Sequence, residues 1–244
     1  MSARLDHVVL GVPDLRSGAA ALATEGLLFA PGGRHPGGTS NALLVAPMRW
    51  SYVELIMAPE EDAGSEESQI TDQVRRGGLV AWAMAVADID AQVRRLADAG
   101  LECQPVEAGA RETTDGRQVR WRTAAIGPGW GMCELPFLIE WATGDAHRTG
   151  LGPDGRAAYL TEIEVSVADM ERVRRLLEVL GLPAGANGAA LECSDGEVLM
   201  RFVDGEPRLS AVCLGWPDGR RARITDREQP RRLCVQVDAV EEVD

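Results

Sequence analysis

Three side chains suited to acid–base or metal chemistry lie in apolar, strand-like surroundings in this sequence. His7 is one of only three histidines and follows an aspartate at the head of the apolar run LDHVVLGVPDL. Glu54, in YVELI, and Glu140, in FLIEW, have apolar residues on both sides. A carboxylate that points inward from such a strand must be paired or bound to a metal, because burying a bare charge is costly. The alternatives are glutamates that face water and a histidine that only packs in the core.

Two further segments carry candidate binding groups. His35 lies in the Gly-rich stretch GGRHPGG, and a loop of this kind before a strand can bring a side chain over the rim of a cleft. In the segment RWR, Arg120 and Arg122 share one face of a strand and Trp121 takes the other face. If the arginines face a cleft, they bind an anionic substrate; if they face solvent, Trp121 belongs to the core.

Composition excludes several classes of protein. The chain has 244 residues, 45% of them hydrophobic, and a formal net charge of −13, which disfavours nucleic acid as a partner. All basic residues are arginine, so a Schiff-base lysine and a P-loop lysine are excluded. Five cysteines without a CxxC spacing predict neither a disulfide framework nor a thiolate zinc site. With no apolar run long enough to span a bilayer and no signal-peptide core, we expect a cytoplasmic protein without a membrane partner.

The elements that position these residues come from an internal repeat. Three apolar runs share a pattern near their ends: a valine, then proline or alanine, then aspartate. These runs are LDHVVLGVPDL, LVAWAMAVADI and LTEIEVSVADM. A segment with helical periodicity follows each run, and Asp14, Asp88 and Asp169 are the expected N-caps of these helices. Short strand-like runs separated by turn residues come next, so the unit is predicted to be βαβββ.

The repeats predict an α+β fold with three modules. We expect modules at 5–57 and 79–142, both within one domain over 1–144. A Gly-rich linker at 145–156 leads to a third, shorter module with a final strand at 157–244. An unpaired module leaves a sheet edge that must be covered, and a homodimer is one way to cover it.

The chain resembles the vicinal oxygen chelate superfamily of glyoxalases, extradiol dioxygenases and bleomycin-resistance proteins. The resemblance lies in βαβββ units that open with a strand-borne histidine and close with a strand-borne glutamate. Within the superfamily, PGGRHPGGTSNALL followed by YVELI and PFLIEW is similar to the glyoxalase-like domain group. The resemblance covers residues 5 to 142 well and the third module only loosely.

The resemblance implies that the first two modules pair as an open, curled mixed sheet around a cleft. It also implies a metal site in this cleft. It implies His7, Glu54 and Glu140 as ligands, with Glu140 and His35 as catalytic residues. The fourth position, which holds histidine or glutamine in the superfamily, falls on Ala81. One imidazole and two carboxylates favour iron, manganese, nickel or magnesium over zinc, although zinc is also possible in such a site. The third module has Glu162 and Val212 at these positions and does not rebuild the set.

Two functions follow, and the sequence does not choose between them. The first is a metal-dependent lyase, isomerase or dioxygenase that acts on a small substrate with adjacent oxygens, because an ion with open positions stabilises developing oxyanions. The second is a metal-free protein that sequesters a small molecule, and Ala81 favours this alternative. Asn41, Trp82 and Arg122 are the candidate substrate contacts, although asparagine near glycine is also ordinary turn chemistry.

Overall fold

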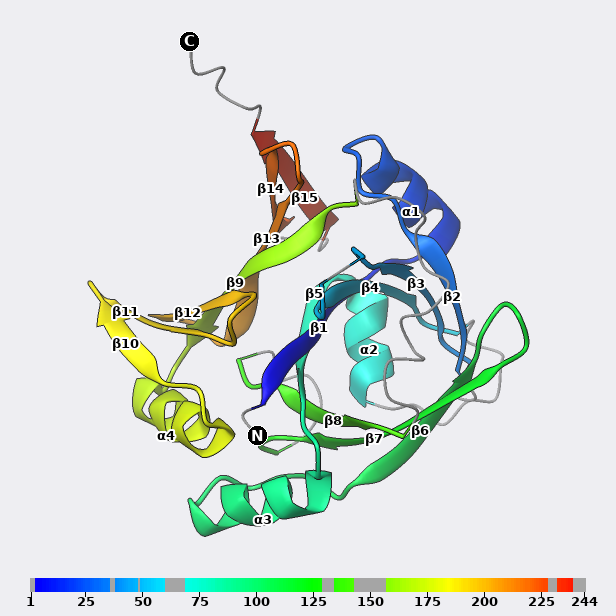
Figure 1. Cartoon of the computed structure of the whole chain (residues 1–244). Coiled ribbons are helices and arrows are strands. Elements are labelled where there is room, and N and C mark those ends of the chain that lie inside the picture. Colours follow the sequence, from blue (N-terminus) through cyan, green and yellow to red (C-terminus); the bar gives the residue numbers. More distant parts are fainter. Residues whose placement is uncertain are drawn as a thin grey trace.

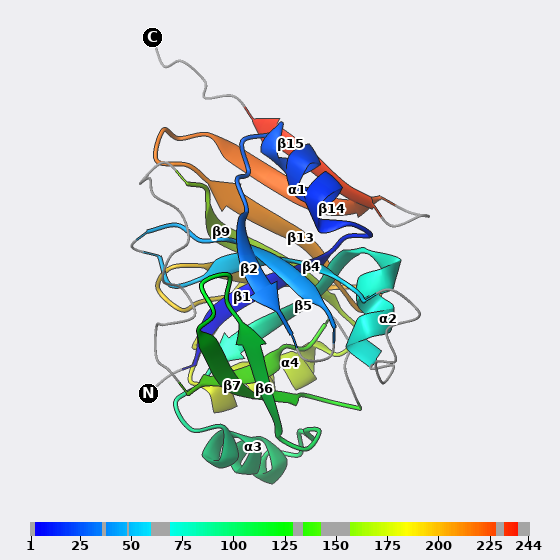
Figure 2. The same ribbon diagram turned by 90° about the vertical axis from the view of Figure 1, so that its right-hand side faces the viewer.

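The computed structural model describes residues 3–35, 38–47, 49–59, 69–128, 134–142, 157–227 and 232–238. The strands in these ranges form two sheets (Figures 1 and 2). One sheet closes into an eight-stranded barrel, and the other is open and has seven strands. The predicted α+β class and βαβββ modules are therefore confirmed, while the linker expected at 145–156 lies outside the described residues.

The barrel consists of the first two repeats. Its strands are β1 (Arg4–Gly11), β2 (Ala30–Arg34), β3 (Ser40–Leu44), β4 (Tyr52–Met57), β5 (Gly78–Ala85), β6 (Glu107–Glu112), β7 (Gln118–Ala125) and β8 (Phe137–Trp141). They follow the order β1-β4-β3-β2-β6-β7-β8-β5 around the barrel. β1 pairs in parallel with β4 and antiparallel with β5, which joins the two repeats at one seam. At the opposite seam, β2 and β6 share a single residue pair, Arg34 with Glu112.

The helices begin where the aspartates of the repeat predict. The described helices are α1 (Leu15–Ala23), α2 (Gln69–Arg76), α3 (Ile89–Asp98) and α4 (Met170–Leu180). The side chains of Asp14, Asp88 and Asp169 accept hydrogen bonds from backbone N–H groups three residues later, at the starts of α1, α3 and α4. Each such N-cap satisfies a backbone N–H group that has no partner within its helix. The same V-(P/A)-D ending therefore fixes the strand-to-helix turn in all three repeats.

The third repeat forms the open sheet together with extra strands. Its strands are β9 (Tyr159–Val167), β10 (Ala184–Asn187), β11 (Ala190–Ser194), β12 (Leu199–Asp204), β13 (Arg208–Gly215), β14 (Arg221–Arg227) and β15 (Arg232–Asp238). β12 pairs in parallel with β9, as β4 does with β1. The third unit is thus a complete βαβββ module that ends at β12. The sequence analysis missed β10 and β14, and it took the last strand of this unit from β13.

The main core lies between the outer surface of the barrel and the open sheet. Trp82 on β5 is fully buried there, and its ring centroid lies 6.1 Å from that of Phe202 on β12. The expectation that Trp82 lines a ligand cleft is therefore wrong. Side chains alternate along a strand, so Trp82 faces the second sheet while the neighbouring Ala81 and Ala83 pack with the residues inside the barrel.

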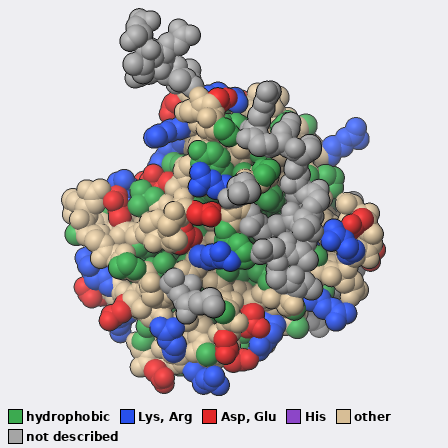
Figure 3. All heavy atoms as spheres, viewed as in Figure 1, with side chains coloured by type: hydrophobic (Ala, Val, Ile, Leu, Met, Phe, Trp, Pro, Cys, Tyr) green, Lys and Arg blue, Asp and Glu red, His purple; other side chains and the backbone are tan. Residues whose placement is uncertain are grey.

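Charges of both signs cover the surface. On the face shown in Figure 3, arginines and acidic side chains are interspersed, without a stripe of one sign. Among the described helices, none combines the length and the apolar character that crossing a membrane requires.

Candidate functional site

A cavity of about 200 Å³ lies inside the barrel, and we call it the chamber. Both repeats contribute to its lining, with an aromatic wall formed by Tyr52, Trp121, Phe137 and Trp141. Helix α2 packs against β1, β4 and β5 and adds Val74 to the lining. The polar groups that face this apolar space are His7, His35, Thr39, Asn41, Glu54, Arg111 and Thr123. Four candidates from the sequence, namely His7, His35, Asn41 and Glu54, are thus brought together.

A chain of polar contacts runs through His7. Its Nδ1 lies 2.6 Å from Oδ1 of Asp6, and its Nε2 lies 3.4 Å from Oε2 of Glu54. The other oxygen of Glu54 accepts a hydrogen bond of 2.6 Å from Nδ2 of Asn41. Asp6, His7, Asn41 and Glu54 are all at most 9% exposed. The imidazole is therefore held between two buried carboxylates. Asn41 is the second partner of the Glu54 carboxylate.

Asp6 is a site residue that the sequence analysis did not identify. Strand alternation predicts that Asp6 and His7 point to opposite faces of β1. The β1–β5 pairing has a shift in register between Leu5 and His7, and such a bulge re-aims side chains. Asp6 consequently contacts the ring of His7, and its Oδ2 accepts a hydrogen bond of 2.9 Å from Nε1 of Trp141. Only its position next to His7 in the sequence pointed to this role.

Aromatic rings pack around the polar chain. The ring of His7 stacks on Tyr52 at 4.8 Å and meets the edge of Phe137 at 5.5 Å. The ring of His35 lies edge-on to Trp121 at 5.6 Å. Burial, the charges of Asp6 and Glu54 and a hydrogen bond to Asp6 raise the pKa of Tyr52 well above 10.0. Tyr52 is therefore a neutral wall residue at any ordinary pH.

The two chamber histidines have pKa values shifted in opposite directions. Burial opposes the charged form of His7, but the hydrogen bond and charge of Asp6, with the charge of Glu54, prevail and raise its pKa above 6.5. For His35, burial together with the positive charges of Arg111 and His7 outweighs the attraction of Glu54 and lowers the pKa below 6.5. Paired groups whose environments separate their pKa values are typical of acid–base sites.

These shifts predict opposite pH dependences for the two histidines. Because the pKa of His7 is higher in the folded than in the unfolded chain, its contribution to the free energy of unfolding is full below pH 6.5 and is lost as the pH rises through the folded value. The contribution of His35 is full above pH 6.5 and is lost as the pH falls. We expect NMR titration of the ring protons, assigned with His7→Asn and His35→Asn variants, to find His7 above and His35 below 6.5. Equal values in the native protein would contradict this placement.

Glu140 and Arg122 do not face the chamber. Oε2 of Glu140 accepts a hydrogen bond of 2.7 Å from the backbone N–H of Ile89, at the start of α3, and it lies 3.8 Å from Nη1 of Arg122. Nη2 of Arg122 donates to both oxygens of Asp90 at 2.7 and 2.8 Å. Glu140 as ligand or catalyst and Arg122 as a substrate contact are thus wrong predictions. Alternation on β7 and β8 directs Trp121 and Trp141 inward instead, so both glutamate and arginine lie on the outer surface beneath α3.

The donors in the chamber do not fit the three-ligand metal site that the superfamily implies. His7 and Glu54 are in place, but Glu140 faces outward and Ala81 has no donor atom. The same chamber contains the buried guanidinium of Arg111, a cation that a divalent ion would have to approach. No group of three or more histidine, cysteine, aspartate or glutamate side chains in the described ranges is arranged to hold a metal ion.

Arg111 is the second site residue that the sequence analysis did not identify. It lies on β6, is 4% exposed, and its Nη1 donates to the carbonyl oxygen of Gly32 on β2. Arg111 pairs with the buried Val119 on β7, and this register turns it inward. Its neighbours in the sequence, EAGARETT, give no periodic signal for an inward arginine, so only the pairing of β6 with β7 decides its direction.

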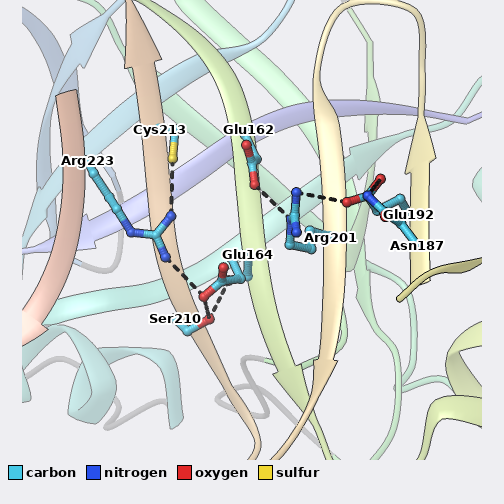
Figure 4. Close-up of polar contacts among 8 residues, drawn as sticks. All are labelled: Glu162, Glu164, Asn187, Glu192, Arg201, Ser210, Cys213 and Arg223. Carbon is cyan, nitrogen blue, oxygen red and sulfur yellow. Dashed lines mark hydrogen bonds and ion pairs between the residues drawn. The ribbon is translucent and has the colours of Figure 1, made fainter. Parts of the chain in front are cut away.

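In the third repeat, the positions that correspond to His7 and Glu54 carry side chains that form ion pairs. By register, Glu162 on β9 corresponds to His7, and Arg201 on β12 corresponds to Glu54, which corrects the assignment of Val212. Nε of Arg201 lies 3.2 Å from Glu162, and Nη2 lies 2.8 Å from Glu192, as Figure 4 shows. The neighbouring Glu164 accepts hydrogen bonds from Arg223 and Ser210 in the same row. These side chains satisfy one another, and the third repeat does not rebuild the site.

Comparison with known proteins agrees with this architecture. Residues 5–181 match the family described as "Glyoxalase-like domain". A hypothetical protein from Staphylococcus aureus has a solved structure with a TM-score of 0.73 at 16% identity, covering 96% of this chain and 98% of that chain. A search of curated proteins finds no match.

Two solved enzyme structures align less well. Methylmalonyl-CoA epimerase from Mycobacterium tuberculosis has 25% identity and a TM-score of 0.38, covering 56% of this chain and 87% of that chain. A mutant of 4-hydroxymandelate synthase from Streptomyces coelicolor has 14% identity and a TM-score of 0.48, covering 83% and 63% of the two chains. The family match over most of the chain, together with the repeated βαβββ modules, shows that the protein belongs to the glyoxalase-like domain family.

Proposed function

We propose that the protein is an acid–base enzyme that moves a proton on a small oxygenated substrate, at a carbon next to a carbonyl group. The observation that carries this proposal is the Asp6–His7–Glu54 chain of contacts in an apolar chamber that also contains Arg111. A carboxylate beside an imidazole supplies a base and a proton relay, and a buried guanidinium supplies positive charge for a developing oxyanion. The substrate class is a 2-oxo acid or a similar compound with two adjacent oxygens.

In the proposed reaction, Glu54 accepts the proton from the carbon atom next to the carbonyl group. The electron pair of that C–H bond moves into a C=C bond, and the carbonyl electrons move onto oxygen to give an enolate. Arg111 stabilises this negative charge, and the apolar walls of the chamber strengthen that interaction. Glu54 then passes its proton to Nε2 of His7, which returns a proton to the substrate carbon or to water, while Asp6 fixes the ring. No electrons are gained or lost overall, so the reaction is an isomerisation or exchange.

A second candidate function is binding without chemistry. The chamber is walled largely by aromatic and aliphatic side chains, which also suits a protein that sequesters a small apolar compound. The two functions differ in whether bound ligand loses a carbon-bound proton. We therefore expect proton exchange to separate them.

The test is proton exchange in D₂O, followed by ¹H NMR on 2-oxobutyrate and 2-oxohexanoate. We expect the protein to accelerate loss of the C3 proton signal above the buffer rate, without added metal and in the presence of EDTA. If these compounds bind but do not exchange their C3 proton, the enzyme proposal is wrong and the second function, binding without chemistry, is supported. If these 2-oxo acids neither bind nor exchange, the proposed substrate class is wrong.

The donor set also predicts the metal content. Two ligand side chains beside a buried arginine hold a divalent ion weakly, so protein purified without chelator is expected to contain far less than one ion per chain by elemental analysis. EDTA should leave Tm unchanged, because an ion that bound only the folded state would stabilise it. The opposite result would be one iron, manganese, nickel, magnesium or zinc ion per chain that is lost in both His7→Ala and Glu54→Ala. It would support the metal-dependent enzyme expected from the sequence.

A further inference from the structure

A second, larger space adjoins the chamber on the outside of the barrel. This groove has a volume of about 760 Å³ and lies between β2 and β6, against about 200 Å³ for the chamber. His35, Asn41 and Arg111 line both spaces, so the groove and the chamber meet at these three residues. Ligand pockets usually measure about 300–1,000 Å³, so the chamber by itself is small for one. A substrate larger than the chamber must extend into the groove.

The barrel seam provides the place for such an extension. β2 and β6 share only the pair Arg34 with Glu112, whereas every residue of β6 is paired with β7. Gly33 has φ of 152°, and a Cβ there would collide with the carbonyl oxygen of Glu112. Glycine is thus required where the two strands approach, and the rest of the seam is open as the groove.

The charge of the groove differs from that of the whole chain. The chain carries a formal net charge of −13, but the groove is lined by Arg34 and Arg111 against the single carboxylate of Glu112. Arg34 is exposed, and its guanidinium makes no ion pair with the described residues. Thr113, Thr114 and Gln118 add hydrogen-bonding side chains, so the lining suits a polar, anionic group.

Asn41, which lines both the chamber and the groove, has a side-chain acceptor without a partner in the described part of the chain. It is 5% exposed, its Nδ2 donates to Glu54, and its Oδ1 has no hydrogen-bond partner among the described residues. A buried acceptor without a partner destabilises the folded protein, because it has lost its hydrogen bonds to water. A donor on a bound molecule would satisfy it.

We propose that the natural substrate is elongated, with its reacting carbonyl end in the chamber and an anionic group, carboxylate or phosphate, in the groove beside Arg34. A hydroxyl or amide N–H between these ends donates to Asn41. This inference rests on the proposed function for the carbonyl end, but the groove itself is defined by the seam between β2 and β6. An arginine pairs well with either anion through charge-assisted hydrogen bonds.

The test compares three probes with the same 2-oxo acid end. 2-Oxohexanoate has a neutral tail, 2-oxoadipate has a terminal carboxylate, and 5-phosphono-2-oxopentanoate has a terminal phosphonate in place of phosphate. Calorimetric titration gives Kd, and quenching of Trp121 and Trp141 fluorescence reports occupation of the chamber. We expect an anionic tail to lower Kd by about tenfold in the native protein. The better of the two anionic tails identifies which anion the groove prefers.

Three variants locate this effect. Arg34→Gln is expected to abolish the advantage of the anionic tail and to leave the Kd of 2-oxohexanoate unchanged. Glu112→Gln removes the opposing charge and is expected to increase the advantage. Arg94→Gln, the same change at an exposed position on α3, is the matched control and should behave as the native protein.

The outcomes separate this inference from the proposed function. If 2-oxohexanoate binds and exchanges its C3 proton but an anionic tail gives no advantage, or keeps its advantage in Arg34→Gln, the elongated substrate is wrong and the enzyme proposal stands. If an anionic tail improves binding but no probe exchanges a proton, the groove is supported and the enzyme proposal fails. If none of the three probes binds, both are overturned.

Discussion

Replacing Glu54 with glutamine is expected to slow exchange of the C3 proton of 2-oxohexanoate by about 10²–10⁴-fold, the usual contribution of a positioned general base. Glutamine keeps the size of the side chain and can still accept from Nδ2 of Asn41, but it cannot take a proton from carbon. The rate is measured by NMR in D₂O, and Kd is measured by titration on the same sample. We expect the rate to fall much more than the affinity.

Glu140→Gln is the matched control for this variant. Both glutamates lie on the last strand of a βαβββ module with apolar neighbours, and the sequence does not distinguish them. Oε2 of Glu140 accepts from the N–H of Ile89 on the outside of the barrel, and glutamine can retain that bond. Exchange in Glu140→Gln should therefore stay within about twofold of the native rate. A large loss in this variant, with little loss in Glu54→Gln, would mean that the two roles are reversed.

Replacing Trp82 with alanine is expected to lower the free energy of unfolding by about 3–5 kcal/mol. The indole is fully buried and packs on Phe202, so its removal leaves a cavity between the barrel and the open sheet. Small proteins are stable by only about 5–15 kcal/mol, so this change removes a large part of the total. Urea unfolding followed by circular dichroism gives the value.

An exposed hydrophobic residue provides the control for Trp82. Leu28 is 70% exposed, and Leu28→Ala should change the free energy of unfolding by less than about 0.5 kcal/mol. The folded fraction of Trp82→Ala should bind 2-oxohexanoate with the native Kd, because Trp82 faces the second sheet and does not line the chamber. If Trp82→Ala keeps near-native stability but no longer binds 2-oxohexanoate, Trp82 contacts the ligand and this prediction is wrong.

The fold was largely predictable from local signals. Each repeat carries an apolar run, an aspartate N-cap and a helical segment, and these depend on nearby residues only. The positions of Asp14, Asp88 and Asp169 therefore predicted the starts of three helices. The pairing of distant strands was not predictable in the same way. The short strand β10, whose residues are all exposed, has no apolar pattern, and the sequence analysis missed it.

The site was predictable in part, and the difference lies in strand register. Sequence alone determined the candidate types, including His7, Glu54, His35 and Asn41, and the modules that carry them. Only the tertiary structure decided which side chains face that space. One residue of register reverses the direction of a side chain, so Glu140 turned outward, and the bulge next to His7 turned Asp6 toward the His7 ring. Arg111 faces inward because β6 pairs with β7, a contact between segments that their own sequences do not specify.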